Sequence, residues 1–374
     1  MQDAEIKRCR SCILPENYPG LSFNEEGICR FCMDHEKTKK IKYLGDEALK
    51  NLIHSYLKKK IDRNEDYDCV VGFSGGRDSS YLLYYLSKVL NLNVLAYSAD
   101  NGFLPEETKS NREKIADKLG VKLVVEDHHY LRKCLKHHLN AWIHKPSPAM
   151  ISMLCTGCRL GLDIGLLRFA KTMKVPVLIW GGTPFEGMDF KPRLMKRGLR
   201  DTKDDSLVLR YTAQILKNPR WILSPSCLWI QLKEFYIHHY AKRKFYRRKA
   251  KKAGILWISP YFTHIKWVEK EILSVLKREL YWETTSDVES TWRGDCHVAI
   301  LRNYLYKKML GFNDNDDHLS CLIRDGQLTR DQALERIRIE GSVKEELIEE
   351  MMNNPGVKYQ RFRIAVEKFC NQIT

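Results

Sequence analysis

Several short motifs in this 374-residue chain combine residue types that carry chemistry. Residues 73–80 (FSGGRDSS) place two glycines, three serines and an aspartate directly after a run of β-branched residues. Adjacent glycines let backbone N–H groups converge on phosphate oxygens, and a helix beginning near Asp78 adds its positive end. The Gly-Lys-Ser/Thr ending of a Walker A loop and the Gly-x-Gly-x-x-Gly spacing of dinucleotide folds are both missing. The motif therefore predicts phosphate binding, against the alternative of an ordinary tight turn.

Two C-x-x-C pairs near the N-terminus, Cys9 with Cys12 and Cys29 with Cys32, are separated by 16 residues. Such pairs supply four thiolates at about 2.3 Å from one tetrahedral zinc ion, and a short segment then folds by binding metal. A closed site leaves no position for a substrate, so the sequence predicts a structural Zn²⁺ site. The alternatives are His35 in place of one cysteine, and four unligated thiols.

A third pair, Cys155 with Cys158, precedes a predicted helix that leads into a strand. Three interpretations stay open: a redox or sulfur-carrying pair, two of three ligands of an iron–sulfur (4Fe–4S) cluster, or an inert packed pair. Cys296 is the expected third ligand of a cluster, ahead of Cys227 and Cys321. In the first two interpretations, Cys155 and Cys158 are catalytic.

The elements that must position these residues alternate between strands and helices. β-branched runs predict four strands, with amphipathic helices between them. This order is typical of a doubly wound parallel α/β sheet, in which ligands bind at the carboxyl ends of the strands. After Lys191 the alternation is expected to stop, and the remainder to be mostly helical. The predicted strands and helices lie at residues 69–73, 79–90, 94–98, 106–119, 121–125 and 175–180.

The string S-G-G-x-D-S between a strand and a helix resembles the PP-loop of the N-type ATP pyrophosphatases, which include asparagine synthetases and tRNA thiolases. In that superfamily the loop binds the departing pyrophosphate, and its aspartate lies near bound Mg²⁺. The resemblance implies ATP and Mg²⁺ as ligands and Asp78 as a catalytic residue. The positions that it assigns to ATP binding are Phe73, Ser74, Gly75, Gly76, Asp78, Ser79, Ser98, Asp100, Gly181 and Gly182.

A more specific resemblance covers the end of the chain, from His297 through Asp317-His318-Leu-Ser to residues 326–334 (GQLTRDQAL). These residues resemble the end of the N-acetyl sugar amidotransferases, PP-loop enzymes of lipopolysaccharide and other surface-polysaccharide biosynthesis. That family also has an N-terminal cysteine knuckle, an Asp-Asn-Gly string like residues 100–102, and a Gly-Gly…Glu-Gly segment like residues 181–187.

The resemblance implies a reaction on a nucleotide sugar. ATP adenylates the oxygen of an N-acetyl group, and ammonia then displaces AMP to give an acetamidine. The chain begins Met-Gln, without a cysteine at position 2, and shows no nucleophile elbow of a class-I glutaminase. A separate glutaminase or ammonia-channelling partner is therefore implied.

The set Cys155, Cys158 and Cys296 departs from this family and resembles the tRNA thiolases instead. If these cysteines bind a cluster, sulfide becomes the nucleophile, and the product is thiolated tRNA or a thiolated small molecule. Ammonia and sulfide attack the same adenylated intermediate, so the loop does not distinguish them. A non-catalytic nucleotide-binding or RNA-binding protein is the remaining alternative.

The formal charge of +16 indicates an anionic partner or substrate. Residues 238–252 (HHYAKRKFYRRKAKK) carry eight Lys or Arg residues among aromatic ones. This stretch predicts contact with RNA or with an anionic membrane surface, against the alternative of a solvated helix face. Without a signal region, or the roughly 18 apolar residues of a membrane span, the expected location is the cytoplasm, peripheral to the membrane at most.

These features divide the chain into four expected parts. A Cys₄ zinc module is followed by the PP-loop domain, a basic aromatic insertion and a helical C-terminal region. Their expected bounds are residues 1–40, 41–190, 191–260 and 261–374.

Overall fold

A computed structural model gives the architecture of this protein. It describes residues 6–37, 41–59, 62–128, 130–155, 158–186, 190–194, 207–225, 228–230, 232 and 244–371, without the side chains of 159–161, 207–211 and 244–247. The strands are β1 Cys69–Gly72, β2 Val94–Asp100, β3 Lys122–Asp127, β4 Val177–Ile179 and β5 Leu256–Ile258. The α-helices are α1 Arg30–Lys37, α2 Gly45–Lys58, α3 Arg77–Tyr84, α4 Glu106–Leu119, α5 Tyr130–His144, α6 Cys158–Thr172, α7 Phe190–Arg193, α8 Leu207–Lys217, α10 Lys244–Lys252, α11 Glu269–Leu280, α12 His297–Leu310, α13 Asp314–Arg324, α14 Arg330–Glu340, α15 Glu345–Asn353 and α16 Tyr359–Asn371. Short helices are the π-helical η1 Tyr85–Val89 and the 3₁₀ helices η2 Pro148–Cys155, η3 Pro219–Ile222 and η4 Pro260–Phe262.

The five strands form one parallel sheet in the order β3-β2-β1-β4-β5. Strand β1 is central, with Val70 opposite both Leu95 of β2 and Leu178 of β4. The chain adds strands on one side of β1 and then crosses to the other side, which creates a switch point between β1 and β4. Loops that follow adjacent strands diverge at such a point and leave room for a ligand.

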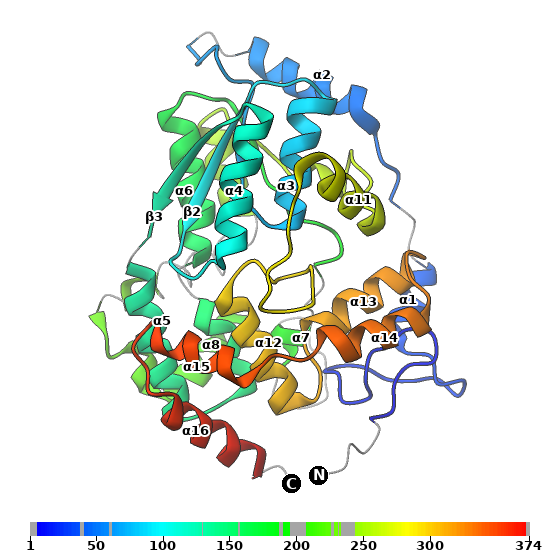
Figure 1. The fold of residues 1–374 in the computed structure, drawn as a ribbon, viewed down its shortest axis with the longest axis vertical. Helices are drawn as coiled ribbons and strands as arrows, with labels where there is room; N and C mark the ends of the chain where they lie inside the picture. The colour runs from blue at the N-terminus through cyan, green and yellow to red at the C-terminus, as the bar shows by residue number, and fades with distance from the viewer. Residues whose placement is uncertain are drawn as a thin grey trace.

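Side chains alternate between the two faces of the sheet, because successive residues of a strand point in opposite directions. Val71 packs in one core cluster with residues of α2, α3, α4 and α11, whereas Val70 packs in another with residues of α6 and α10. Helices therefore cover both faces, as Figure 1 shows for α3, α4 and α6. The predicted doubly wound α/β sheet is confirmed.

The expectation that the alternation stops at Lys191 is wrong. Helix α10 packs on α6, and β5 pairs with β4 in parallel register, with Ile258 opposite Ile179. This strand has three residues, too few to show a period in the sequence, and pairing with β4 fixes it. The expected insertion at 191–260 thus contains an edge of the sheet.

The lower half of the molecule in Figure 1 is mostly helical, and both ends of the chain lie there. The N-terminal segment contacts α13, where Arg8 forms an ion pair of 2.7 Å with Asp316 and the Ile13 N–H donates to Ser320 Oγ at 3.4 Å. The predicted capping box of Thr329 opens α14. Within the described ranges, no helix has both the length and the apolar character needed to cross a membrane.

Candidate active site

The glycine-rich loop follows β1 and has a conformation that only glycine allows. Gly75 has φ +85°, and a Cβ atom there would lie 2.4 Å from the Thr108 carbonyl oxygen. Within the loop, Ser74 Oγ lies 3.0 Å from Ser79 Oγ and accepts a hydrogen bond of 3.2 Å from the Gly76 N–H. The two hydroxyls brace the turn, and the glycines bring its backbone close to its neighbours.

Helix α3 begins directly after this loop, and its amino end suits an anion. Its N-cap residue, Gly76, has no side chain to cap the first turn, whose N–H groups lack partners within the helix. Two carbonyl groups of the loop face the protein, because Gly75 accepts from Trp282 Nε1 at 3.0 Å and Asp78 from the Tyr261 hydroxyl at 2.9 Å. Donors without acceptors are left to bind a phosphate.

Asp78 is oriented by two donors on one of its oxygens. Its Oδ1 accepts from Arg77 Nε and from Trp267 Nε1, both at 3.0 Å. The buried Arg77 in turn donates to Glu269 at 2.6 Å. This chain of contacts connects the predicted catalytic carboxylate to α11.

Glu269 is the centre of a buried ionic network. It accepts from Arg77, and from Arg336 at 2.5 Å, while His318 Nε2 lies 3.7 Å away. Burial raises the pKa of Glu269, but His318 and the two arginines outweigh it and hold the pKa well below its ordinary value. His318 is also stacked on Trp292, with ring centroids 4.4 Å apart. The network fixes helices α3, α11, α13 and α14 to one another.

Asp295 is a site residue that the sequence analysis missed. Its Oδ2 accepts from Ser74 Oγ at 3.3 Å and lies 2.6 Å from where a Cβ of Gly76 would be. Burial and the nearby charge of Asp78 raise the pKa of Asp295, against the effect of Arg293. A carboxylate therefore lies against the loop from a segment more than 200 residues away in sequence. The one signal in the sequence that could have identified Asp295 is its position immediately before Cys296.

The end of β2 lies beside the same loop. Asp100 Oδ1 accepts from the Gly102 N–H at 2.8 Å, and its Oδ2 lies 3.5 Å from Arg112. Arg112 also donates to the buried Ser98 at 3.3 Å. Its Cβ atom would be 3.1 Å from a Cβ placed on Gly75. Ser98 and Asp100 are thus joined to the loop through one arginine.

The loop after β4 completes this edge of the sheet. A Cβ on Gly181 would lie 3.6 Å from the Cα of Ser79, and one on Gly182 would lie 3.0 Å from Trp180. Glu186 closes the turn by accepting from the Thr183 N–H at 3.3 Å. The predicted ATP-binding positions after β1, β2 and β4 therefore share one end of the sheet, which is the geometry that parallel strands require.

Cys155, Cys158 and Cys296 also come together at this end. Asn101 Nδ2 lies 3.5 Å from the sulfurs of Cys158 and Cys296, so these sulfurs lie within twice that distance of each other. Cys155 accepts from Arg302 Nη1 at 3.1 Å. Burial, with the nearby Cys155 and Asp295, raises the pKa of Cys296 to about 11.

The three sulfurs are too far apart to surround one ion. The group of cysteines in the described structure whose ligand atoms all lie within 4.8 Å of one another is Cys9, Cys12, Cys29 and Cys32. Ligands of an iron–sulfur cluster bind different irons, so they need not lie within this distance of one another. Of the other two candidate third ligands, Cys321 contacts Arg324, and Cys227 lies outside the described residues.

The four N-terminal cysteines are buried and form a compact set that fits a metal ion. The sulfurs of Cys12 and Cys29 lie 3.7 Å apart, close to the edge of about 3.8 Å of a tetrahedron with 2.3 Å bonds. Three main-chain N–H groups donate to Cys9 Sγ, as is usual around metal thiolates. Arg324 Nη1, at 3.8 Å from Cys12 Sγ, adds positive charge beside the set. Four thiolates with such donors suit Zn²⁺.

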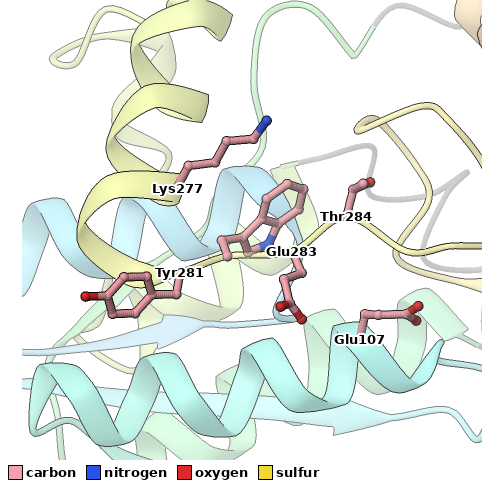
Figure 2. A pocket seen from close by; sticks show the side chains of 6 residues that line it. Glu107, Lys277, Tyr281, Glu283 and Thr284 are labelled. Atoms are coloured by element: carbon pink, nitrogen blue, oxygen red, sulfur yellow. The ribbon is translucent and has the colours of Figure 1, made fainter.

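A surface hollow of about 620 Å³ lies next to this site but not on it (Figure 2). Trp282 is its connection with the loop, through the hydrogen bond to Gly75. The predicted ATP-binding residues do not line the hollow, so we assign the chemistry to the sheet edge. Its lining residues are Glu107, Lys277, Tyr281, Trp282, Glu283 and Thr284.

The basic stretch at 238–252 is described only from α10 onward, and residues 238–243 lie outside the described residues. Ala250 is fully buried against the sheet, while Lys249, Lys251 and Lys252 are exposed. Helix α10 therefore has a packed side and a cationic exposed side. Contact with RNA or a membrane stays a prediction.

Comparison with known proteins identifies the C-terminal region. Residues 290–374 match the family model described as "LPS biosynthesis protein WbpG-like, C-terminal domain". The predicted resemblance to proteins of surface-polysaccharide biosynthesis is therefore confirmed for these residues. An uncharacterized protein of Methanocaldococcus jannaschii is 27% identical over 119 residues, which cover 27% of this chain and 43% of that protein. The chain thus matches less than half of that relative's length.

Solved structures with similar folds have low TM-scores. The U34-tRNA thiolase NcsA from Methanococcus maripaludis, with its 4Fe–4S cluster, is 16% identical with a TM-score of 0.32, over 90% of this chain and 91% of that chain. The NH3-dependent NAD synthetase from Campylobacter jejuni is 14% identical with a TM-score of 0.28, over 63% and 91%. The NMN synthetase from Francisella tularensis is 12% identical with a TM-score of 0.27, over 59% and 100%. Similarities of this size identify neither the reaction nor its residues.

Proposed function

We propose that this protein is an ATP-dependent amidotransferase that converts the N-acetyl group of a nucleotide sugar into an acetamidine, in lipopolysaccharide biosynthesis. One observation carries the proposal. Asp295, which belongs to the region that matches the lipopolysaccharide family model, contacts Ser74 of the loop at 3.3 Å. The region that matches the lipopolysaccharide-biosynthesis model thus places a carboxylate against the proposed phosphate-binding loop.

The reaction consists of two displacements. The amide oxygen of the N-acetyl group attacks the α-phosphorus of ATP, and the bond to pyrophosphate breaks. Ammonia then adds to the imidate carbon, and AMP departs with the former amide oxygen. The product is an acetamidine, and the protons released by ammonia end on the amidine nitrogen and in solvent. Adenylation is required because an amide oxygen by itself is a very poor leaving group.

The loop residues act on the departing pyrophosphate. The first-turn N–H groups of α3 and the hydroxyls of Ser74 and Ser79 donate to its oxygens as negative charge develops on them. Asp78 and Asp295 would hold Mg²⁺, which neutralises phosphate charge when bound. Without that cation, Asp295 would repel a phosphate at Gly76. The adenosine lies at the ends of β2 and β4, near Ser98, Asp100, Gly181 and Gly182.

Two further parts of the protein have separate roles in this proposal. Cys9, Cys12, Cys29 and Cys32 would hold a structural Zn²⁺ and so fix the fold of the N-terminal segment, which contacts α13 through Arg8 and Ile13. Ammonia comes from a separate glutaminase or ammonia-channelling partner. We place the enzyme in the cytoplasm, where the exposed side of α10 is available to an anionic membrane surface or to RNA.

Sulfur transfer is the second candidate function, and the contacts of Asn101 with Cys158 and Cys296 favour it. In this version Cys155, Cys158 and Cys296 would hold an iron–sulfur cluster, which would supply sulfide in place of ammonia. The acceptor is then tRNA or a small molecule. The iron and acid-labile sulfide contents of anaerobically purified protein test this candidate. Both present in the wild type and both lost in Cys155→Ala would favour sulfur transfer.

The experiment is a turnover assay with the full chain, ATP, Mg²⁺ and N-acetylated nucleotide sugars, with ammonium or sulfide as donor. We expect pyrophosphate and AMP in equal amounts, and a mass change that matches replacement of oxygen by NH. Asp78→Asn and Asp295→Asn should each reduce turnover at least about 100-fold. Asp117→Asn, at an exposed position on α4, should leave it unchanged. ATP-independent product formation, or full activity of Asp78→Asn, would refute the proposal.

A further inference from the structure

Three cations surround one buried carboxylate near the end of the sheet. Lys191 of α7 donates to Asp314 Oδ2 at 2.6 Å. Arg302 of α12 lies 3.8 Å from the same oxygen, and Arg293, before α12, lies 3.9 Å from it. Two helices and a loop from separate parts of the chain thus bring their positive groups to one point.

All three cations share one buried carboxylate. Lys191 and Arg302 are each 8% exposed and Asp314 is 1% exposed. Two other carboxylates act on Arg293: Glu186, at 4.0 Å and with a side chain more than one third exposed, and the partly buried Asp295. Buried charges normally occur with partners of opposite sign. Burial and, after it, the nearby Arg302 lower the pKa of Lys191 to about 7 in spite of Asp314.

One buried atom each of Arg293, Arg302 and Asp314 has no hydrogen-bond partner among the described residues. Arg302 Nε and Asp314 Oδ1 are buried and have no hydrogen-bond partner in the described structure. Arg293 Nε is in the same condition, and Arg293 has a left-handed backbone with φ 56°. A non-glycine residue in that conformation is uncommon and is found at ligand sites more often than elsewhere. Guanidinium donors without acceptors are what a planar or tetrahedral oxyanion requires.

The cluster adjoins the candidate active site on two sides. Arg302 Nη1 donates to Cys155 Sγ at 3.1 Å. Arg293 is two residues before Asp295, which contacts Ser74 of the loop. Glu186 belongs to the turn after β4. An anion at Arg293 and Arg302 would therefore belong to a molecule that also reaches the loop.

We propose that Lys191, Arg293 and Arg302 bind an anionic group, a phosphate or a carboxylate, of the acceptor substrate. Asp314 keeps the three cations together when that group is not bound. This subsite deepens the proposed function and rests on it for the identity of the acceptor. It is separate from the loop, whose anion is the pyrophosphate of ATP.

The test is isothermal titration calorimetry, in which each probe is titrated into the full chain with the loop saturated by α,β-methylene-ATP and Mg²⁺. Two probes differ by one carboxylate: UDP-N-acetylglucosamine and UDP-N-acetylglucosaminuronic acid. We expect at least one to bind, and Arg302→Gln to weaken it about 10- to 100-fold. Arg293→Gln changes a partly exposed side chain and should show a similar loss if Arg302→Gln does not fold. Arg338→Gln, at an exposed position, is the control.

The two probes identify the anion. Equal binding of both, lost in the variants, assigns the subsite to phosphate. Tighter binding of the uronic acid, with the preference lost in Arg302→Gln and Arg293→Gln, assigns it to carboxylate. Unchanged binding in both variants, or no binding of either probe to the wild-type protein, would overturn the proposal. Failure of turnover with intact, variant-sensitive binding would instead refute the proposed reaction and leave the subsite standing.

Discussion

Replacing Gly75 with alanine is the most direct test of the loop geometry. Gly75 has φ +85°, and the new methyl group would lie 2.4 Å from the Thr108 carbonyl oxygen. Gly120, at the end of α4, provides a matched control with φ +66° and no atom within 4 Å of its Cβ position. Gly75→Ala therefore combines backbone strain with a collision, and Gly120→Ala introduces the strain alone.

The expected magnitudes follow from these contacts. A left-handed alanine costs about 1–2 kcal/mol at either position. In Gly75→Ala, the methyl or the carbonyl must also move from 2.4 Å to at least 3.0 Å, the practical limit for a Cβ contact. That movement breaks the hydrogen bond from Trp282 to the Gly75 carbonyl, which is worth about 1 kcal/mol. We expect a loss of roughly 3 kcal/mol in the free energy of unfolding, against about 1–2 kcal/mol for the control.

The assays are chemical denaturation and ATP binding by calorimetry. Gly75→Ala should weaken ATP at least about tenfold, because the N–H groups move with the loop, and Gly120→Ala should bind ATP like the wild type. Wild-type ATP affinity in a folded Gly75→Ala protein would show that the loop does not bind the nucleotide. Equal stability of the two variants would show that the Thr108 contact imposes no constraint.

Three further predictions concern the metal, the ionic network and one lysine. Elemental analysis should find one zinc ion per chain, lost in Cys12→Ser and retained in Cys370→Ser. Only Cys12→Ser should have a lower Tm than the wild type. A metal-free wild-type protein with the same Tm as the metal-bound protein would contradict this. Glu269→Gln should lower the free energy of unfolding by about 3–5 kcal/mol, because it leaves the charges of Arg77 and Arg336 without their carboxylate partner. Glu279→Gln, at a partly exposed position, should change it by less than about 0.5 kcal/mol. Lys191, which faces Asp314, Arg293 and Arg302, has a pKa of about 7 and loses its charge as pH rises. Binding of the UDP-sugar probes should therefore weaken above pH 7, and Lys191→Met should remove this pH dependence. A flat wild-type binding profile between pH 6 and 9 would contradict the prediction.

The sequence was sufficient for features that depend on local order. The glycine pair of the loop, each of the two N-terminal C-x-x-C pairs and the capping box at Thr329 lies within a few residues, where spacing fixes geometry. The helix predicted at 106–119 agrees with α4 in both bounds. Parallel topology also followed, because alternating strands and helices leave few other arrangements.

Tertiary structure alone decided which distant residues meet. Asp295 is more than 200 residues from Ser74, and the group of Lys191, Arg302 and Asp314 joins three helices, so no local pattern announces either. Strand β5 has only three residues and exists because β4 offers it hydrogen bonds. Sequence spacing determines contacts within a turn or a helix, whereas contacts between elements depend on the packing of the whole chain. The cluster of cations around Asp314 is therefore a property of the fold.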